Sequence, residues 1–184
     1  VLVGNQLADE VRKAFYARIF LSYRKKDRAL AQQLMALIHE DPQLRDVAIW
    51  YDEFLTPGES FRENIARAMQ SSKMMALLVT PNLLEMPGGK PNFVMAEEYP
   101  AAKRMGIEVL PAEMVKTDRG ALCEKYGELP PCVDPRAGEL GERLADTLCR
   151  VAVLGNDTDP EHNFLIGLAY LEGIDVETDR ERGL

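Results

Sequence analysis

The sequence lacks the long apolar run and the basic excess that define several large classes of protein. No stretch approaches the roughly 20 continuous apolar residues that a membrane-spanning helix needs. No charged segment followed by an apolar one opens the chain, as it would in a secretion signal. The net charge of −8 at pH 7 repels polyphosphate. We therefore expect a soluble cytoplasmic protein that binds neither nucleic acid nor a membrane.

Cysteines and histidines are few and far apart in the sequence. The three cysteines, Cys123, Cys132 and Cys149, are odd in number and form no C-x-x-C pair. The two histidines, His39 and His162, are distant in sequence and have no ligand-like neighbours. We expect reduced thiols, as in a cytosol, and neither a metal site nor a bound cofactor.

The chain does contain a regular alternation of short apolar strands and amphipathic helices. Strands are expected at residues 17–23, 47–50, 74–80 and 107–110. Helices are expected after Asp27, which has the position of a helix cap, after Ser60, which has capping-box spacing to Glu63, and from Pro91 to Met105 with Pro100 inside. This order predicts an α/β fold with a parallel sheet flanked by helices.

The same pattern predicts which residues are interior and where a ligand binds. We expect Phe20, Ile49, Leu77 and Val109 inside the sheet. Ligands of open parallel sheets bind outside the carboxyl ends of the strands. The loops after Leu21, Trp50 and Thr80 are therefore the places to look for function.

Three segments carry a resemblance to a known family. They are FLSYRKKD at residues 20–27, WYD to PGE at residues 50–59 followed by Ile65, and NFVMAEEY at residues 92–99. Together they resemble the motifs of TIR domains of the bacterial, NAD-cleaving type, which have a flavodoxin-like fold. The likeness covers about residues 17 to 140.

The resemblance implies NAD⁺ as substrate and assigns roles to individual residues. A catalytic glutamate follows an aromatic residue in the third segment. Counting from Phe93 indicates Glu97, whereas counting from the following apolar and small residues indicates Glu98, which we favour. The residues expected to bind substrate are Ser22, Tyr23, Arg24, Lys25, Trp50, Tyr51, Asp52, Gly58 and Phe93.

One carboxylate is sufficient for this chemistry. Breaking the nicotinamide–ribose bond releases a neutral pyridine from a cation, so no general acid is needed. A buried carboxylate stabilises the oxocarbenium-like ribose. Arg24 and Lys25 could bind the pyrophosphate of the substrate. Trp50, Tyr51 or Phe93 could stack on one of its rings.

Each of these sequence features also has a simpler structural interpretation. Adjacent glutamates are usually a solvated face, residues 24–28 can be a surface run, and Trp50 and Phe93 can be core packing. The loop at residues 52–59 can serve interaction only, as in a non-catalytic TIR scaffold that self-associates. A nucleoside-processing relative with a similar sheet is a third alternative.

The chain divides into an N-terminal lead segment at residues 1–16, the TIR-like domain at 17–138, and a helical linker with a first repeat at 139–184. The tail from His162 resembles Sel-like repeats, with Gly173 ending one helix and a second beginning near Asp179. Because one repeat cannot bury its own face, we expect the array to continue and to bind a protein or ligand trigger. Exposed apolar residues and Gly58 in the loop at 52–59 predict homo-oligomers through TIR–TIR contacts.

Overall fold

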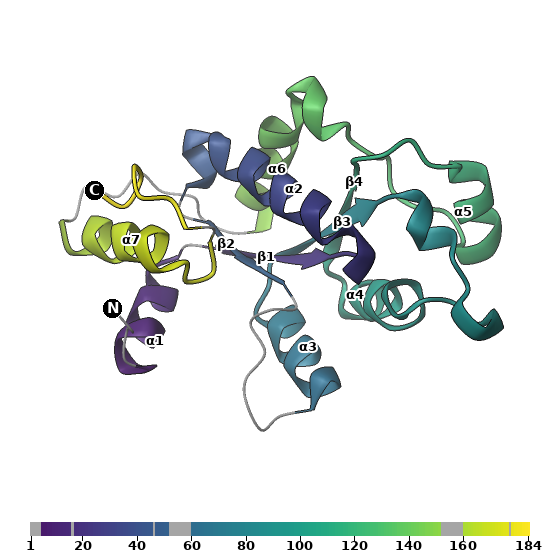
Figure 1. Cartoon of the computed structure of the whole chain (residues 1–184), viewed down its shortest axis with the longest axis horizontal. Coiled ribbons are helices and arrows are strands. Elements are labelled where there is room, and N and C mark those ends of the chain that lie inside the picture. Colours follow the sequence, from purple (N-terminus) through teal and green to yellow (C-terminus); the bar gives the residue numbers. More distant parts are fainter. Residues whose placement is uncertain (1–4, 16, 46, 52–59, 152–159, 177) are drawn as a thin grey trace.

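The structure contains one four-stranded sheet in which all strands are parallel (Figure 1). This computed structural model describes residues 5–15, 17–45, 47–51, 60–151, 160–176 and 178–184. The strands are β1 (Ala17–Ser22), β2 (Val47–Trp50), β3 (Met74–Val79) and β4 (Glu108–Glu113). Their order, β2-β1-β3-β4, confirms the predicted parallel α/β sheet. The connections change direction between β1 and β3, where sheets of this kind bind ligands.

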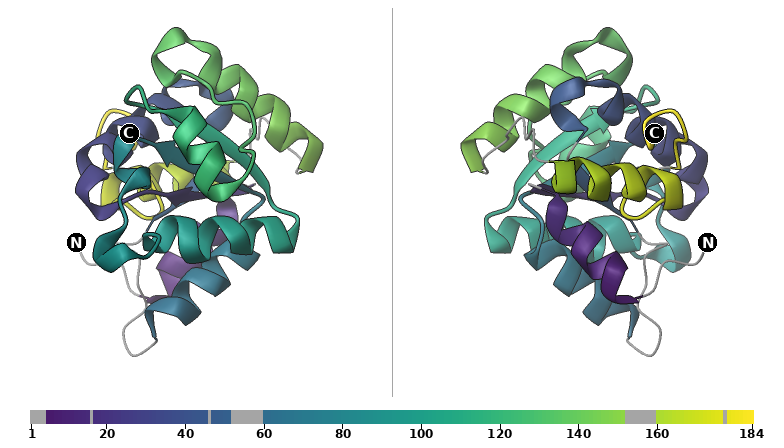
Figure 2. Two further views of the ribbon diagram at one scale, coloured as in Figure 1. Left: turned by 90° about the vertical axis from the view of Figure 1, so that its right-hand side faces the viewer. Right: turned by 90° about the vertical axis from the view of Figure 1, so that its left-hand side faces the viewer.

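Helices cover both faces of the sheet (Figures 1 and 2). On one face lie α2 (Arg28–Glu40) and α6 (Glu139–Val151), and on the other lie α3 (Phe61–Gln70) and α4 (Tyr99–Met105). A shorter helix, α5 (Arg119–Tyr126), adds one leucine to the second face. The core is therefore two apolar layers separated by the sheet.

Side chains alternate between these layers along each strand, as the pleat of a strand requires. Ile19 of β1 contacts the layer under α2, and the next residue, Phe20, contacts the layer under α4. The four residues expected inside the sheet, Phe20, Ile49, Leu77 and Val109, are all buried. That expectation is confirmed.

The core extends past residue 138, where the sequence placed the end of the domain. Leu140, Leu144 and Leu148 of α6 are buried in the same layer as the residues of α2. They are spaced four residues apart and so lie on one side of the helix. An amphipathic helix expected as a linker is thus part of the packing of the sheet.

The start of α3 is a capping box, as the sequence predicts. The backbone N–H of Glu63 donates to the Ser60 hydroxyl, and the backbone N–H of Ser60 donates to the Glu63 carboxylate. Two backbone donors at the helix start are thereby satisfied.

Residues from both ends of the chain pack together beside β2 (Figures 1 and 2). A helix in the lead segment, α1 (Asn5–Ala14), which the sequence analysis did not anticipate, lies against α7 (Pro160–Glu172). Together they bury Val11, Ile166 and Tyr170. The Tyr170 hydroxyl donates to the backbone carbonyl of Arg45, 2.9 Å away, which fixes α7 to the segment before β2.

The second helix expected near Asp179 is absent from residues 178–184. Gly173, with a φ of 70°, ends α7 as predicted. The Asp179 carboxylate then accepts hydrogen bonds from the backbone of Glu181 and Arg182, but residues 180–183 form turns. The aspartate therefore caps a turn, because its side chain satisfies the local N–H groups without helix propagation.

Backbone groups from outside the strands bond to both edges of the sheet. At β2, the N–H of Ile49 donates to the carbonyl oxygen of Asp175, 2.9 Å away. At β4, Val133 accepts from the N–H of Glu113 and donates to the carbonyl of Pro111, each at 2.9 Å. Each edge strand thus has a bonded neighbour on its outer side.

Candidate functional site

A cavity of about 450 Å³ lies at the carboxyl ends of β1 and β2, where the sequence placed the functional loops. Its volume lies within the range of small-molecule sites. The lining residues come from β1, from the segment after it, from β2 and from the start of the helical segment before α4. They are Leu21, Tyr23, Arg24, Lys25, Lys26, Trp50, Phe93, Val94 and Glu98.

Glu98 is the acidic side chain of this cavity. It is 7% exposed, and the hydroxyl of Ser22 donates a hydrogen bond to its carboxylate. Ser22 ends β1, and the alternation of side chains directs it to the same side of the sheet as Phe20, the side that α4 covers. The strand and the helical segment therefore bring together two residues that are 76 positions apart.

A π-helical turn places Glu98 at the cavity. The turn, η5 (Val94–Glu98), is closed by the N–H of Tyr99, which donates to the carbonyl of Val94 five residues earlier. Since a π turn holds one residue more than an α turn, the fifth residue after Phe93 reaches the position that an α-helix gives to the fourth. This reconciles the two counts that indicated Glu97 and Glu98.

The single helix expected from Pro91 to Met105 is therefore wrong in two details. Pro91 precedes the helix, and the side-chain oxygen of Asn92 accepts from the N–H of Met95, at 3.3 Å. The helix also contains the π turn, after which it continues without a break through Pro100 to Met105. An interior proline has no N–H to donate, so one helical hydrogen bond is missing at Pro100, as the sequence predicts.

Glu97 lies outside the cavity. Its side chain is 45% exposed and forms an ion pair with Arg62 of α3, at 3.0 Å. The two adjacent glutamates thus have different surroundings, one a surface ion pair and the other a buried hydrogen bond. Only Glu98 of the pair lines the cavity.

Aromatic side chains form an apolar wall of the cavity. Trp50 is 6% exposed and stacks on Phe20, with ring centroids 4.9 Å apart and an angle of 15° between the planes. Phe93 is half-buried and also lines the cavity. Both residues therefore belong to the core layer and to the cavity wall, so the two interpretations of the sequence are compatible.

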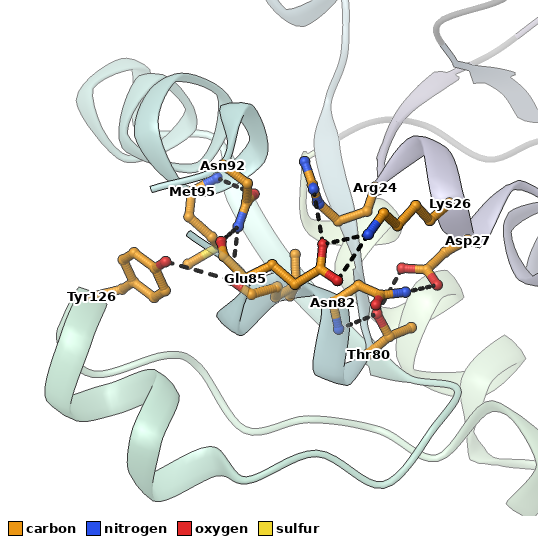
Figure 3. Close-up of polar contacts among 10 residues, drawn as sticks. Arg24, Lys26, Asp27, Thr80, Asn82, Glu85, Asn92, Met95 and Tyr126 are labelled. Carbon is orange, nitrogen blue, oxygen red and sulfur yellow. Dashed lines mark hydrogen bonds and ion pairs between the residues drawn. The ribbon is translucent and has the colours of Figure 1, made fainter. Parts of the chain in front are cut away.

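Cationic side chains from the segment after β1 form the rim. Arg24 and Lys26 both bind the carboxylate of Glu85, at 3.2 Å from the guanidinium and at 2.9 and 3.0 Å from the ammonium (Figure 3). Hydrogen bonds from Lys26 first, and from Arg24 second, hold the pKa of the Glu85 carboxyl below its ordinary 4.5. In the part of the chain that the structure describes, the buried Nε of Arg24 has no hydrogen-bond partner.

Hydrogen bonds to the backbone hold the segment that carries Glu85. The side-chain amide of Asn92 donates to the carbonyls of Leu83 and Glu85, at 2.7 and 3.3 Å. The Tyr126 hydroxyl donates to the Leu83 carbonyl, at 3.4 Å (Figure 3). The sequence analysis missed Glu85 and Lys26, because nothing in the local pattern indicates a pairing across 59 residues.

Asp27 does not cap α2 through its side chain, contrary to expectation. It occupies the cap position, but its carboxylate accepts from the Thr80 hydroxyl and the Asn82 amide, both at 2.6 Å. The 3-10 turn η1 (Lys25–Asp27), which precedes α2, turns this side chain toward the loop after β3. Asp27 therefore joins the loops after β1 and β3 beneath the rim.

The other residues expected to bind substrate have different positions. Tyr23 and Lys25 line the cavity. Tyr51 is half-buried against the layer under α2 and is not among the lining residues. Asp52 and Gly58 lie outside the described residues, with the rest of the loop at 52–59.

The described residues contain neither a potential metal site nor a potential membrane span. Within those residues, no three His, Cys, Asp or Glu side chains form a group that could hold a metal ion. No described helix is both long enough and apolar enough to cross a membrane.

Comparison with known proteins identifies the family. The family profile described as TIR domain matches residues 19–128, which is more than half of the chain and includes all four strands from Ile19 onward. No curated protein matches the chain. The matched region contains every lining residue of the cavity. The chain therefore belongs to the TIR domain family.

Proposed function

We propose that this protein is an NAD⁺ nucleosidase that hydrolyses the bond between nicotinamide and ribose and acts in bacterial defence or toxicity signalling. The observation that carries the proposal is the buried carboxylate of Glu98 in a cavity that also has an aromatic wall and a cationic rim. A TIR scaffold that only binds other proteins has no need of a buried acid in such a cavity.

The chemistry follows from the charge that develops on the ribose. The C1′–N bond breaks with both electrons going to the pyridinium nitrogen, so nicotinamide leaves as a neutral molecule. The remaining ribose has oxocarbenium character, and the Glu98 carboxylate stabilises that charge while Ser22 fixes its orientation. Water then adds to C1′ and loses a proton to give ADP-ribose. Capture by an adenine nitrogen in place of water gives a cyclic product.

The other walls suit the rest of the substrate. Trp50 and Phe93 offer planar apolar surfaces against which a nicotinamide or adenine ring can stack. Arg24, Lys25 and Lys26 offer positive charge for the diphosphate. The carboxylate and the cationic side chains would thus bind different parts of one dinucleotide.

Nicotinamide release from NAD⁺ by the purified protein tests the proposal. Glu98→Gln keeps the shape of the side chain and removes its charge, so we expect a loss of about 10² to 10³ in kcat. Glu97→Gln is the matched control and retains wild-type turnover, because Glu97 lies outside the cavity. Activity unaffected by Glu98→Gln contradicts the catalytic assignment. A wild-type protein that releases no nicotinamide supports the alternative, a non-catalytic scaffold that self-associates.

We also propose that activity depends on assembly of TIR domains and that α7 belongs to a Sel-like repeat that binds a trigger. Contacts between copies that complete the cavity would make turnover per molecule rise with protein concentration. Constant turnover across a thousandfold dilution of a protein that sediments as a monomer throughout would exclude the assembly requirement.

A further inference from the structure

We infer that Glu85 is an internal counter-ion whose carboxylate a phosphate-bearing ligand replaces, and that it lowers the affinity of the cavity for diphosphates without changing its affinity for neutral nucleosides. The role of Glu85 rests on the proposed function only for the identity of the substrate. The binding of a diphosphate at the rim can be measured without any cleavage of NAD⁺.

Glu85 binds cations that belong to the cavity. Arg24 and Lys26 line the cavity, and both direct nitrogen atoms at the Glu85 carboxylate within 3.2 Å. Glu85 itself is not among the lining residues. The carboxylate is therefore bound from outside to the groups that an anion within the cavity would bind.

The backbone around Glu85 is fixed, whereas its carboxylate is accessible. Asn92 and Tyr126 hold the backbone around Glu85 through the carbonyls of Leu83 and Glu85. The Glu85 side chain is nevertheless 38% exposed, and its partner Lys26 is 63% exposed. Exposed ion pairs of this kind contribute little to stability and exchange readily. The carboxylate can thus rotate into water without any movement of the loop.

Arg24 is only 17% exposed, and its Nε is buried without a hydrogen-bond partner among the described residues. A planar guanidinium has five donors and matches phosphate oxygens bidentately. The Glu85 carboxylate accepts a hydrogen bond from one guanidinium nitrogen, Nη2, at 3.2 Å. A diphosphate offers more acceptor oxygens and more negative charge than one carboxylate, so it competes for the same guanidinium where a neutral nucleoside cannot.

The charge of Glu85 affects the affinity for anionic ligands in a defined direction. Each anionic ligand must displace the carboxylate or accept its repulsion, whereas an uncharged ligand does neither. Removing the charge of Glu85 should therefore strengthen the binding of diphosphates and leave the binding of adenosine unchanged. If Glu85 instead served to position Arg24 and Lys26, its removal would weaken diphosphate binding.

Calorimetric titration of the whole chain with ADP-ribose, and separately with adenosine, tests this. For Glu85→Gln we expect the Kd for ADP-ribose to fall about threefold to tenfold, and the Kd for adenosine to stay at the wild-type value. Glu142→Gln, an exposed change of the same charge on α6, controls for net charge and leaves both constants unchanged. Circular dichroism confirms that both variants fold as the wild type.

Several outcomes would overturn the inference. These are weaker or unchanged ADP-ribose binding by Glu85→Gln, equal tightening toward adenosine, or the same tightening by Glu142→Gln. Absence of ADP-ribose binding by both the wild type and Glu85→Gln would also overturn it. Failure of the proposed function gives a different result. If the protein binds ADP-ribose as described but releases no nicotinamide, the role of Glu85 as a counter-ion stands and only the enzymatic assignment is wrong.

Discussion

Two carboxylates in this molecule each bind two cations, yet one is buried at the edge of the sheet and the other is exposed at the rim of the cavity. Asp175 is 2% exposed and binds Arg18 at 2.5 Å and Arg12 at 3.5 Å. Glu85 is 38% exposed and binds Arg24 and Lys26. A buried charge cannot lose its partner without a large desolvation cost, whereas an exposed one exchanges its partner for water.

The difference separates a structural cluster from an exchangeable one. The backbone of Asp175 also bonds to β2, so the buried pair fixes the tail to the sheet. Among the described residues, the backbone of Glu85 bonds instead to Asn82 and Asn92, neither of which belongs to a strand. The carboxylate of Asp175 therefore attaches the tail at one end of the strands, whereas the carboxylate of Glu85 can exchange its cations for water at the other end.

The largest expected effect is on stability at Asp175. Asp175→Asn keeps a residue type that tolerates the positive φ of 57° and removes only the charge. We expect the free energy of unfolding to fall by about 2 to 3 kcal/mol, because Arg18 is left largely buried and unpaired. Urea denaturation measures this. Glu85→Gln is the control and leaves the urea midpoint unchanged, and equal losses in both variants would erase the distinction between the clusters.

A smaller effect is expected at Ser22, whose side-chain hydroxyl bonds to the buried carboxylate of the cavity. Ser22→Ala removes the hydroxyl that donates to Glu98. If Glu98 is catalytic, we expect kcat for NAD⁺ cleavage to fall about tenfold, in line with the worth of a hydrogen bond to a charged group. Steady-state kinetics give the kcat and KM values separately. A change confined to KM would show that Ser22 does not act by orienting Glu98.

The smallest effect is a pH dependence at Glu85. The pKa of Glu85 is lowered by its hydrogen bonds from Lys26 and then Arg24, so the ion pair is fully present above the ordinary value of 4.5 and is lost as pH falls through the lowered pKa. The difference in ADP-ribose affinity between wild type and Glu85→Gln should therefore be constant from about pH 8 to pH 5. Titrations at several pH values check this. A difference that disappears already near pH 6 would point to another group.

The strands were predictable because a parallel sheet buried on both faces leaves continuous apolar runs in the sequence. The capping box at Ser60 was predictable because its spacing is local. The preference for Glu98 over Glu97 rested on the packing of the residues that follow, and Tyr99 is indeed buried, at 3% exposed. Whether Glu98 is catalytic stays a prediction.

The remaining features depend on partners distant in sequence or on competition between local bonds. The π turn before Pro100 reflects a choice between helix types that share the same apolar pattern. Asp27 prefers Thr80 and Asn82 to the helix it precedes, which only the folded arrangement reveals. The packing of α1 on α7 joins the two ends of the chain, so neither helix alone indicates it.

The backbone bonds at the two edges of the sheet have a consequence for solubility. An unpaired edge strand is a template for strands of other molecules, and β2 and β4 are the edges of this sheet. Asp175 and Val133 occupy them, and both residues follow the matched TIR region, which ends at residue 128. A protein trimmed to that region would expose both edges at once. It should aggregate by edge-to-edge pairing, whereas the whole chain carries its own protection against it.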